Sequence, residues 1–417
     1  MKIIDNLKST YQRYPRHFWT LILAMFIDHL GGSLIFPFLS LYLTQKFNVG
    51  FSVVGVIFAL HSSAAFFGNI LGGALTDKLG RKTMLIFGLI ASATSVLLMG
   101  LINKLEVYYL LALFTGLFSN MGGPAVQAML TDILPEKNRT EGFGIHRVAF
   151  NLAVTIGPAI GGLLAGIDFL WLFVTDCIIS IITAIIVFLA LPETRPAAAA
   201  GEAEKTLAQS IGGYGLVFRD RIFVILITLA LISTVVYAQM NTSLSVFLRD
   251  MHGISPQHYG YILSLNAGMV VLFQFWVTRQ IKTFHPLILM AVGTFFYAIG
   301  FGMYGFVSTY ALFLFAMVVI TVGEMILAPV GQSIIARLAP ENMRGRYMAA
   351  FHMSWGVSYA LGPLLAGIVI DNYNPNWVWY AGGILCGISC LGYYWLYKRA
   401  GGRFQAIETS EDLPVQA

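Results

Sequence analysis

The sequence predicts an all-α membrane protein in which twelve transmembrane helices form two pseudo-symmetric six-helix bundles. Its composition, a series of apolar runs and an internal repeat support this fold class. Of the 417 residues, 57% are hydrophobic and 11% are charged, whereas a soluble domain has about 45–50% apolar and about 25% charged residues. A soluble chain of this length cannot bury so much apolar surface in one core, so we expect lipid to cover it.

Twelve apolar runs are long enough to cross a bilayer, which takes about 20 mostly apolar residues. In the first half they lie near residues 18–43, 52–76, 83–102, 107–131, 142–166 and 170–191. In the second half they lie near residues 222–248, 257–278, 286–307, 309–336, 346–370 and 377–397. We therefore expect an N-terminal bundle (1–191), a polar cytoplasmic linker (192–221), a C-terminal bundle (222–403) and a cytoplasmic tail (404–417).

The basic residues predict the orientation of these helices. Three of the 25 Lys and Arg, namely Lys46, Lys104 and Arg249, fall in loops on the side opposite the N-terminus, and Arg147 falls inside the fifth span. The others lie on the same side as the N-terminus, so the positive-inside rule places both termini in the cytoplasm. We expect the protein to lie in the inner membrane of the cell. The net charge of +5 is thus a topology signal, and it gives no reason to expect a nucleic-acid partner.

The two halves also match each other at an offset of 205 residues, without a gap over about forty residues. The matched pairs include Pro124 with Pro329, Gln127 with Gln332, Arg139 with Arg344, and Gly157-Pro158 with Gly362-Pro363. Each half has six spans and starts on the same side, so the halves are parallel repeats. Repeats of this kind place a solute site near the bilayer midplane at their interface, and rocking of one half against the other gives alternating access.

The loop between the second and third spans reads GGALTDKLGRKTML, from Gly72 to Leu85. It resembles the signature of the major facilitator superfamily, whose positions are filled here by Gly73, Asp77, Lys78, Gly80, Arg81 and Lys82. We expect Gly73 to allow close helix packing and Gly80 to allow a tight turn. The resemblance implies that Asp77 faces the N-terminus of the eleventh helix near Gly345, so the motif concerns gating. The corresponding loop of the second half, TRQIKTFHP, lacks the pattern.

The fifth span contains NLAVTIGPAIGG, from Asn151 to Gly162. This segment resembles the antiporter motif of the drug/proton antiporter branch of the superfamily, with Gly157 for close contact and Pro158 for a bend. The eleventh span carries GPLLAG, with Gly362 and Pro363. The alternative to an antiporter motif is therefore a pattern that serves ordinary packing of small residues and was copied when the two halves duplicated. One departure concerns the fourth span, where family members often carry Arg and this chain reads ALFTGLF. Arg147 is our candidate substitute.

Ionisable groups in the bilayer are costly and usually face a cavity or a partner. We expect Asp28 and Glu324 to be proton or cation sites, because a carboxylate that alternates between a proton and a cationic substrate is the simplest exchanger chemistry. Alternatively, each is a buried carboxyl tied to backbone or to Arg147. For Arg147 itself, the alternative to pairing with Asp28 is lining the cytoplasmic side of the cavity. Asp176, near the outer end of the sixth span, is a weaker candidate.

Further polar and aromatic residues within the spans are candidates for the substrate cavity: His29, Asn120, Gln127, Asn151, Tyr237, Asn241, Asn266, His352 and Trp355. Hydrogen bonds between helices are the alternative for each. His146 is expected to be structural and near the membrane surface. The three cysteines, all in apolar runs, lack nearby His or carboxylates and are expected to pack rather than bind metal.

These features favour a secondary active transporter that exports lipophilic or cationic small molecules in exchange for protons. The alternative keeps the fold and changes the cargo to a sugar or another metabolite, although sugar sites usually need a denser set of polar side chains. An enzyme is disfavoured, because the sequence lacks a nucleophile or metal constellation, and an ATP-driven pump would need a phosphate-binding loop. We expect no cofactor, a proton gradient as the driving force, and a monomer whose partners are its solute, protons and lipid.

Overall fold

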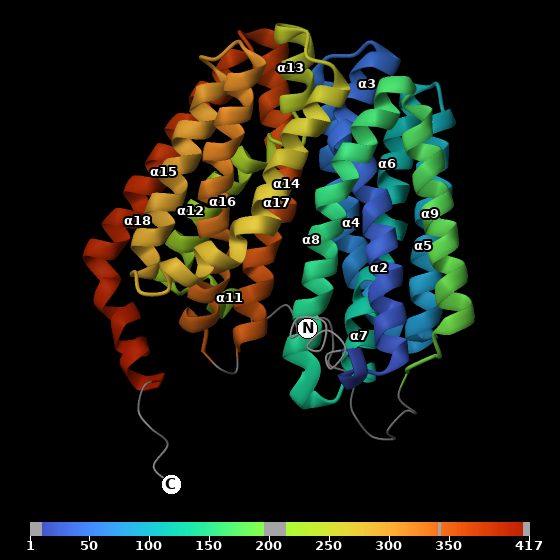
Figure 1. Ribbon diagram of the computed structural model, residues 1–417, viewed down its shortest axis with the longest axis horizontal. Coiled ribbons are helices and arrows are strands. Elements are labelled where there is room, and N and C mark those ends of the chain that lie inside the picture. The colour runs from blue at the N-terminus through green and yellow to red at the C-terminus, as the bar shows by residue number, and fades with distance from the viewer. Residues whose placement is uncertain (1–10, 196–213, 341–342, 412–417) are drawn as a thin grey trace, which may run out of the picture. The chain divides into compact units, whose positions relative to one another are not determined.

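The computed structural model describes residues 11–195, 214–340 and 343–411, and most of them belong to long helices (Figure 1). Over these ranges the backbone forms α-helices joined by short turns, and contains no strand. Ten of the described helices are long and apolar enough to cross a membrane. Long apolar helices satisfy every backbone hydrogen bond internally, as lipid requires.

The chain divides into two compact units. The first comprises residues 1–49, 56–200 and 255–267, and the second comprises residues 50–55, 201–254 and 268–417.

The first half of the chain contains six spans, some of them in more than one piece. Its elements are α2 (Arg16–Ile35), η1 (Phe36–Phe38), α3 (Leu39–Phe47), α4 (Phe51–Leu79), α5 (Arg81–Leu101), α6 (Leu105–Ser119), η2 (Asn120–Gly122), α7 (Gly123–Ile133), α8 (Glu136–Ile167) and α9 (Leu170–Ala190).

The second half follows the same order of spans. Its elements are α11 (Tyr214–Val217), α12 (Arg221–Ala238), α13 (Leu244–His252), α14 (Pro256–Ile281), α15 (Pro286–Tyr304), α16 (Tyr310–Leu338), α17 (Arg344–Asn372) and α18 (Asn376–Glu411). Most of the predicted linker, residues 196–213, and the end of the predicted tail, residues 412–417, lie outside the described residues. Helix α18 extends into the predicted tail as far as Glu411.

The predicted twelve spans correspond to these helices. The fourth span is interrupted by the 3₁₀ turn η2, which leaves α6 and α7 with 15 and 11 residues. Neither piece alone is long enough to cross a bilayer. The twelfth span is α18, whose Gly, Trp and Tyr residues make it less apolar than its neighbours. The chain is thus a multi-pass, all-α membrane protein.

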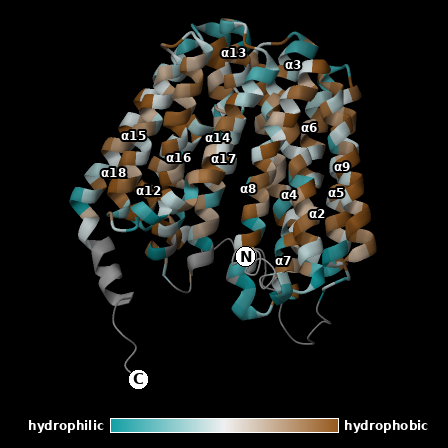
Figure 2. Ribbon diagram, viewed as in Figure 1, coloured by the Kyte–Doolittle hydropathy of each residue, from teal (hydrophilic) through white to brown (hydrophobic). Residues whose placement is uncertain are grey.

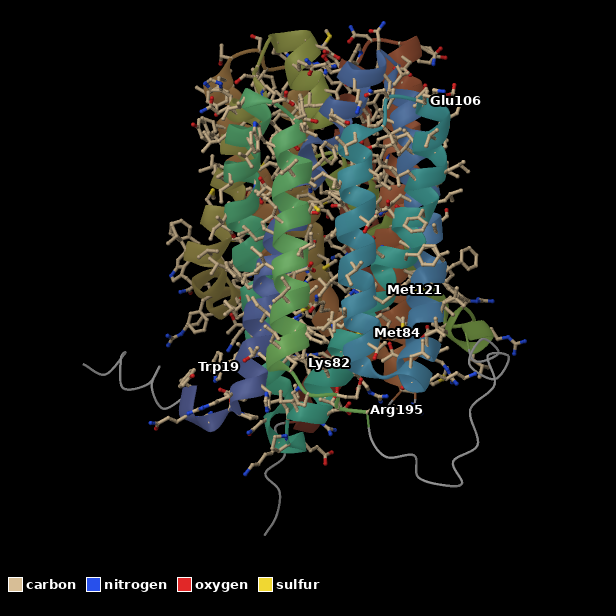
Figure 3. All side chains as sticks on the ribbon, turned by 90° about the vertical axis from the view of Figure 1, so that its right-hand side faces the viewer. Trp19, Lys82, Met84, Glu106, Met121 and Arg195 are labelled. Carbon is tan, nitrogen blue, oxygen red and sulfur yellow. The ribbon has the colours of Figure 1, made fainter. Side chains whose placement is uncertain are left out.

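Hydropathy follows the expected distribution, with apolar residues along the helices and polar residues at their ends (Figure 2). Large side chains such as Leu110 and Phe275 are exposed on helix surfaces, at 68% and 83%, where lipid would cover them. Inside the first unit, Phe18, Met84 and Met121 belong to one buried apolar cluster. Figure 3 shows Met84 and Met121 part way along the helices of this unit.

A polar residue caps the start of α12 in the second unit. The Asp220 carboxylate accepts hydrogen bonds from the backbone N–H groups of Ile222 and Phe223 at the start of α12, as an N-cap does. Its other oxygen accepts a hydrogen bond from Tyr347 Oη on α17 at 3.3 Å. This cap therefore fixes the end of α12 and connects it with a second span.

Candidate functional site

The first unit contains a cavity of about 400 Å³. Side chains of α2, α5, α7, α8 and the α6–η2 junction line it, and these are Met25, Asp28, His29, Leu85, Leu89, Ser92, Ser119, Asn120, Val126, Gln127, His146 and Phe150. Four predicted site residues, Asp28, His29, Asn120 and Gln127, are therefore brought together by the fold. A cavity that mixes apolar walls with a few polar groups is the usual form of a small-molecule site.

Two histidines face each other in this cavity. The ring of His29 packs edge-on against Phe150, with centroids 4.8 Å apart, and its centroid lies 6.1 Å from that of His146. His146 Nε2 is buried without a hydrogen-bond partner, as is the Ser119 hydroxyl. The prediction that His146 is a structural residue near the membrane surface is wrong, because it lines the cavity. Unpartnered polar atoms in a cavity wall are available to a ligand or water.

The break in the fourth span shapes one wall of the cavity. At η2 the Asn120 side chain donates a hydrogen bond to the Gly116 carbonyl at 3.0 Å, and Pro124 stands in the first turn of α7. The break packs closely on α5, since a Cβ at Gly88 would lie 2.9 Å from the Gly122 nitrogen. Pro in a first helical turn needs no N–H partner, so the sequence Gly-Gly-Pro favours restarting the helix here.

The second unit has its own polar centre, around Glu324 of α16. Tyr237 Oη on α12 donates a hydrogen bond to Glu324 Oε1 at 2.9 Å. Tyr297 of α15 stacks on Tyr237, with centroids 5.7 Å apart, and Trp355 of α17 packs edge-on against the same ring at 5.7 Å. Four helices therefore meet at this pair, in which Tyr237 binds the Glu324 carboxyl and packs against two further aromatic rings.

Asn241 and Tyr359 extend this centre by one helical turn. Asn241 Nδ2 lies 3.4 Å from Tyr359 Oη, and Tyr359 follows Trp355 by four residues on α17. Sequence reasoning missed Tyr297 and Tyr359. The i, i+4 spacing of Tyr359 from Trp355 is a signal that could have found the second, whereas no local pattern distinguishes Tyr297 from a core residue.

Several other predicted site residues lie elsewhere. Asn151 and Arg147 of α8 are exposed and are not among the residues lining the first cavity. Arg147 does not pair with Asp28, whose described surroundings include no cation. Asn266 is 7% exposed in α14, and His352 is an exposed residue of α17 beside Phe351. A role of these four residues in the site stays a prediction.

The predicted gating loop connects α4 and α5 through Gly80, whose φ of +102° is a conformation that glycine tolerates. Arg81 Nε lies 3.1 Å from Asp132 Oδ2 of α7, and Arg81 also pairs with Asp77 at 3.4 Å. The prediction that Gly73 allows close helix packing is wrong. A Cβ there would meet Pro124 at 4.0 Å, an ordinary contact, whereas a Cβ at Gly72 would lie 2.5 Å from the Met121 carbonyl oxygen.

The same loop is bound by the segment after α9, which sequence reasoning treated as linker. Glu193 accepts hydrogen bonds from the backbone N–H groups of Arg81 and Lys82 at 2.8 and 3.2 Å. Arg195 Nη1 donates to the Lys78 carbonyl at 2.6 Å, and Thr194 Oγ1 donates to Asp132 at 3.1 Å. Figure 3 shows Lys82 and Arg195 at the same end of the first unit, opposite Glu106.

Glu193 carries a testable pH dependence. Burial acts to raise the pKa of its carboxyl, but hydrogen bonds from the backbone N–H groups of Arg195, Arg81, Lys82 and Thr194 outweigh it, and the pKa is lowered. A lowered pKa in the folded state stabilises the loop fully above the ordinary glutamate pKa, and this stabilisation is lost as the pH falls through the lowered value. We therefore expect Glu193→Gln to speed hydrogen exchange of the Arg81 and Lys82 amides at neutral pH.

The difference in exchange between Glu193→Gln and the wild type should shrink in acid, after correction for intrinsic exchange rates. Glu136→Gln, at an exposed residue in the first turn of α8, is the control and should leave these amides unchanged. Equal exchange in wild type and Glu193→Gln at neutral pH would contradict this role of Glu193.

The glycines of the fifth span make close helix contacts, as their motif predicts. A Cβ at Gly157 would lie 1.9 Å from Ser33 Oγ of α2, and one at Gly161 would lie 2.4 Å from the Leu34 carbonyl oxygen. In the eleventh span, a Cβ at Gly362 would lie 2.8 Å from Gln239 Nε2. Pro158 and Pro363 both stand inside their helices. The glycine-proline pairs thus serve helix packing in both halves.

A multi-pass helical protein with an internal repeat, a polar centre in each unit and a charged loop of this pattern has the features of a membrane transporter rather than an enzyme. Comparison with known families agrees. The model described as Major Facilitator Superfamily matches residues 21–279 and 240–413. The chain belongs to this superfamily.

Similar proteins extend over almost the whole chain. An uncharacterized MFS-type transporter, YttB of Bacillus subtilis, is 28% identical over 86% of this chain and 90% of its own. The Na(+), Li(+), K(+)/H(+) antiporter of Planococcus maritimus is 25% identical over 90% and 94%. The quinolone resistance protein NorA of Staphylococcus aureus is 22% identical over 89% and 95%. The solved structure of the nucleoside transporter NupG superposes with a TM-score of 0.77 over 92% and 100%, at 16% identity, which supports the fold.

Proposed function

We propose that this transporter exports lipophilic organic cations across the inner membrane in exchange for protons, as a monomer with both termini in the cytoplasm. The hydrogen-bonded Tyr237–Glu324 pair within its aromatic surroundings carries the proposal. Aromatic faces attract cations by about 0.5–2 kcal/mol, and more strongly when the site is dry. A carboxylate beside them supplies the opposite charge.

The exchange follows from the chemistry of one carboxyl group. Deprotonated Glu324 would bind a cation, and protonated Glu324 would release it, because a neutral acid no longer attracts the positive charge. The proton gained on one side of the membrane thus replaces the cation lost there, and charge on the site is conserved through the cycle. Two similar proteins support such a role, since one is described as an antiporter of cations against protons and another as a quinolone resistance protein.

The cavity of the first unit favours a second candidate. Its polar lining of Asp28, His29, Asn120, Gln127 and His146 is denser than the sequence suggested, and such groups suit a metabolite with several hydrogen-bonding atoms. That candidate keeps the fold and alternating access but changes the cargo to a sugar or a similar polar molecule.

The test is transport by the purified protein in liposomes with an imposed pH gradient. We expect a fluorescent lipophilic cation such as ethidium to move against the proton flow, and its transport to stop when a protonophore collapses the gradient. Empty liposomes and the protein without a gradient are the controls. Movement of a labelled sugar or nucleoside while ethidium is ignored would overturn the proposed cargo and favour the second candidate.

A further inference from the structure

A second buried carboxyl group faces α2, the helix that carries Asp28. Asp176 belongs to the buried face of α9, together with Phe173 and Ser180, and is only 3% exposed. Position in the sequence ranked it low among the acidic residues, because it lies near one end of its span. In the folded chain, however, Asp176 is buried against α2.

Asp176 packs against α2 at Gly31, which has no side chain. A Cβ at Gly31 would lie 2.2 Å from Asp176 Oδ1, so the carboxyl occupies the space that any other residue at position 31 would fill. Gly31 follows Asp28 by three residues, and residues at this spacing share a helix face. The charges of Asp28 and Asp176 are accordingly close enough to interact.

Nothing in the described surroundings compensates a second negative charge. The described ion pairs involve neither Asp28 nor Asp176, and no described group donates a hydrogen bond to either. Ser180, one turn along the same face of α9, is 1% exposed and its hydroxyl has no hydrogen-bond partner. Burying an unpaired carboxylate is unfavourable, so a proton is the simplest occupant.

The other titratable groups nearby do not change this conclusion. His29 follows Asp28 on α2, and His146 of α8 faces His29 across the cavity. Cys177 follows Asp176 on α9 and interacts with its charge, and the buried stretch of α5 that packs on α9 offers hydroxyl groups such as that of Ser95. None of these groups carries a permanent positive charge.

We propose that Asp28 and Asp176 form a coupled carboxyl pair inside the first unit that holds one proton. Asp28 lines the cavity and exchanges its proton there, while Asp176 holds the proton in the buried position. Two adjacent carboxyls do not both ionise, and they titrate as one system. This deepens the proposed proton exchange, on which it rests for its role in transport.

A metal cation fits the pair less well than a proton. Hard cations take a full shell of oxygen ligands, and the carbonyl groups of α2 and α9 are already used within their helices. The described residues contain no group of three or more His, Cys, Asp or Glu that could hold a metal ion. Binding of sodium or potassium in place of the proton is the alternative that the experiment must distinguish.

Infrared spectroscopy of the purified protein tests the pair without any transported solute. Protonated carboxyls absorb at a frequency distinct from carboxylates, so the wild type should show a carboxylic-acid band at neutral pH that Asp176→Asn loses. Asp28→Asn should change the pH range over which that band disappears. Asp168→Asn is the matched control, because Asp168 lies at the exposed start of α9 and caps Leu170; it should keep the wild-type band.

Two glycines test the geometry. Gly31→Ala should displace the Asp176 carboxyl and alter the band, whereas Gly32→Ala should not, since a Cβ there meets nothing within 4 Å. In a Glu324→Gln background, which removes the other proposed proton site, a band that survives the Asp28→Asn/Asp176→Asn double change, or one that added sodium or potassium removes, would overturn the proposal. If the band behaves as expected while ethidium is not exported, the pair stands and the proposed function fails.

Discussion

Glu324→Gln is expected to stop proton-driven export while leaving the protein folded. Glutamine has the shape of glutamate and keeps an oxygen that can accept the hydrogen bond of Tyr237 Oη, so the packing of the aromatic rings should persist. It cannot bind or release a proton, and it has no charge to attract a cation. Removing one partner of a close, buried charge pair costs about 2–5 kcal/mol, so we expect a loss of affinity for the cation of about thirtyfold or more.

Binding and transport of ethidium would be measured on the same preparation, with thermal unfolding as the check on folding. Glu106→Gln is the matched control, because Glu106 stands in the first turn of α6 at an exposed position. Tyr237→Phe removes the hydrogen bond and retains the ring, so it should weaken binding less than Glu324→Gln does. Unchanged gradient-driven export by Glu324→Gln would exclude this carboxyl as the proton carrier.

Much of the fold could be predicted from the sequence because a bilayer imposes simple length and polarity rules on each span. The glycine and proline positions of the repeat could also be found, since helix packing requires small residues wherever two backbones approach. Gly157 and Gly362 both make the contacts that their motif predicts.

The direction in which each side chain points could not be predicted. In a soluble helix, polar residues mark the outer face, but a membrane helix is apolar on both its lipid face and its packed face, so hydropathy does not distinguish them. This is why Asn151 was expected in the cavity and is exposed, and why Tyr297 was missed. Asp176 depends on Gly31 of another helix, which no local pattern reports.

The repeat conserved backbone features more faithfully than charges. At the offset of 205 residues, Arg81 corresponds to Pro286 and its partner Asp132 corresponds to Arg337. The ion pair between Arg81 and Asp132 therefore has no counterpart in the second half. Packing glycines are needed in both halves, whereas one charged loop is enough if its task is to stabilise a single state of the transporter.

Gly157→Ala is expected to destabilise the first unit and to reduce transport strongly. Its Cβ would lie 1.9 Å from Ser33 Oγ and 3.0 Å from the Ser33 carbonyl carbon, so α8 and α2 would have to separate. The Ser33 hydroxyl also donates a hydrogen bond to the Ala153 carbonyl at 3.1 Å, which the movement would break. Overpacking of a close contact costs about 1–3 kcal/mol, and thermal unfolding in detergent would measure the loss.

The matched control is Gly144→Ala on the same helix, where a Cβ would meet nothing within 4 Å. It should unfold at the temperature of the wild type or slightly above it, because alanine favours a helix more than glycine does. The double variant Gly157→Ala/Ser33→Gly adds a methyl group to α8 and removes the Ser33 hydroxymethyl group from α2, and it should recover part of the lost stability. If Gly157→Ala and Gly144→Ala unfold at the same temperature, the glycine motif of the fifth span does not serve this contact, and a role in the proposed exchange of protons for the cation would have to explain it.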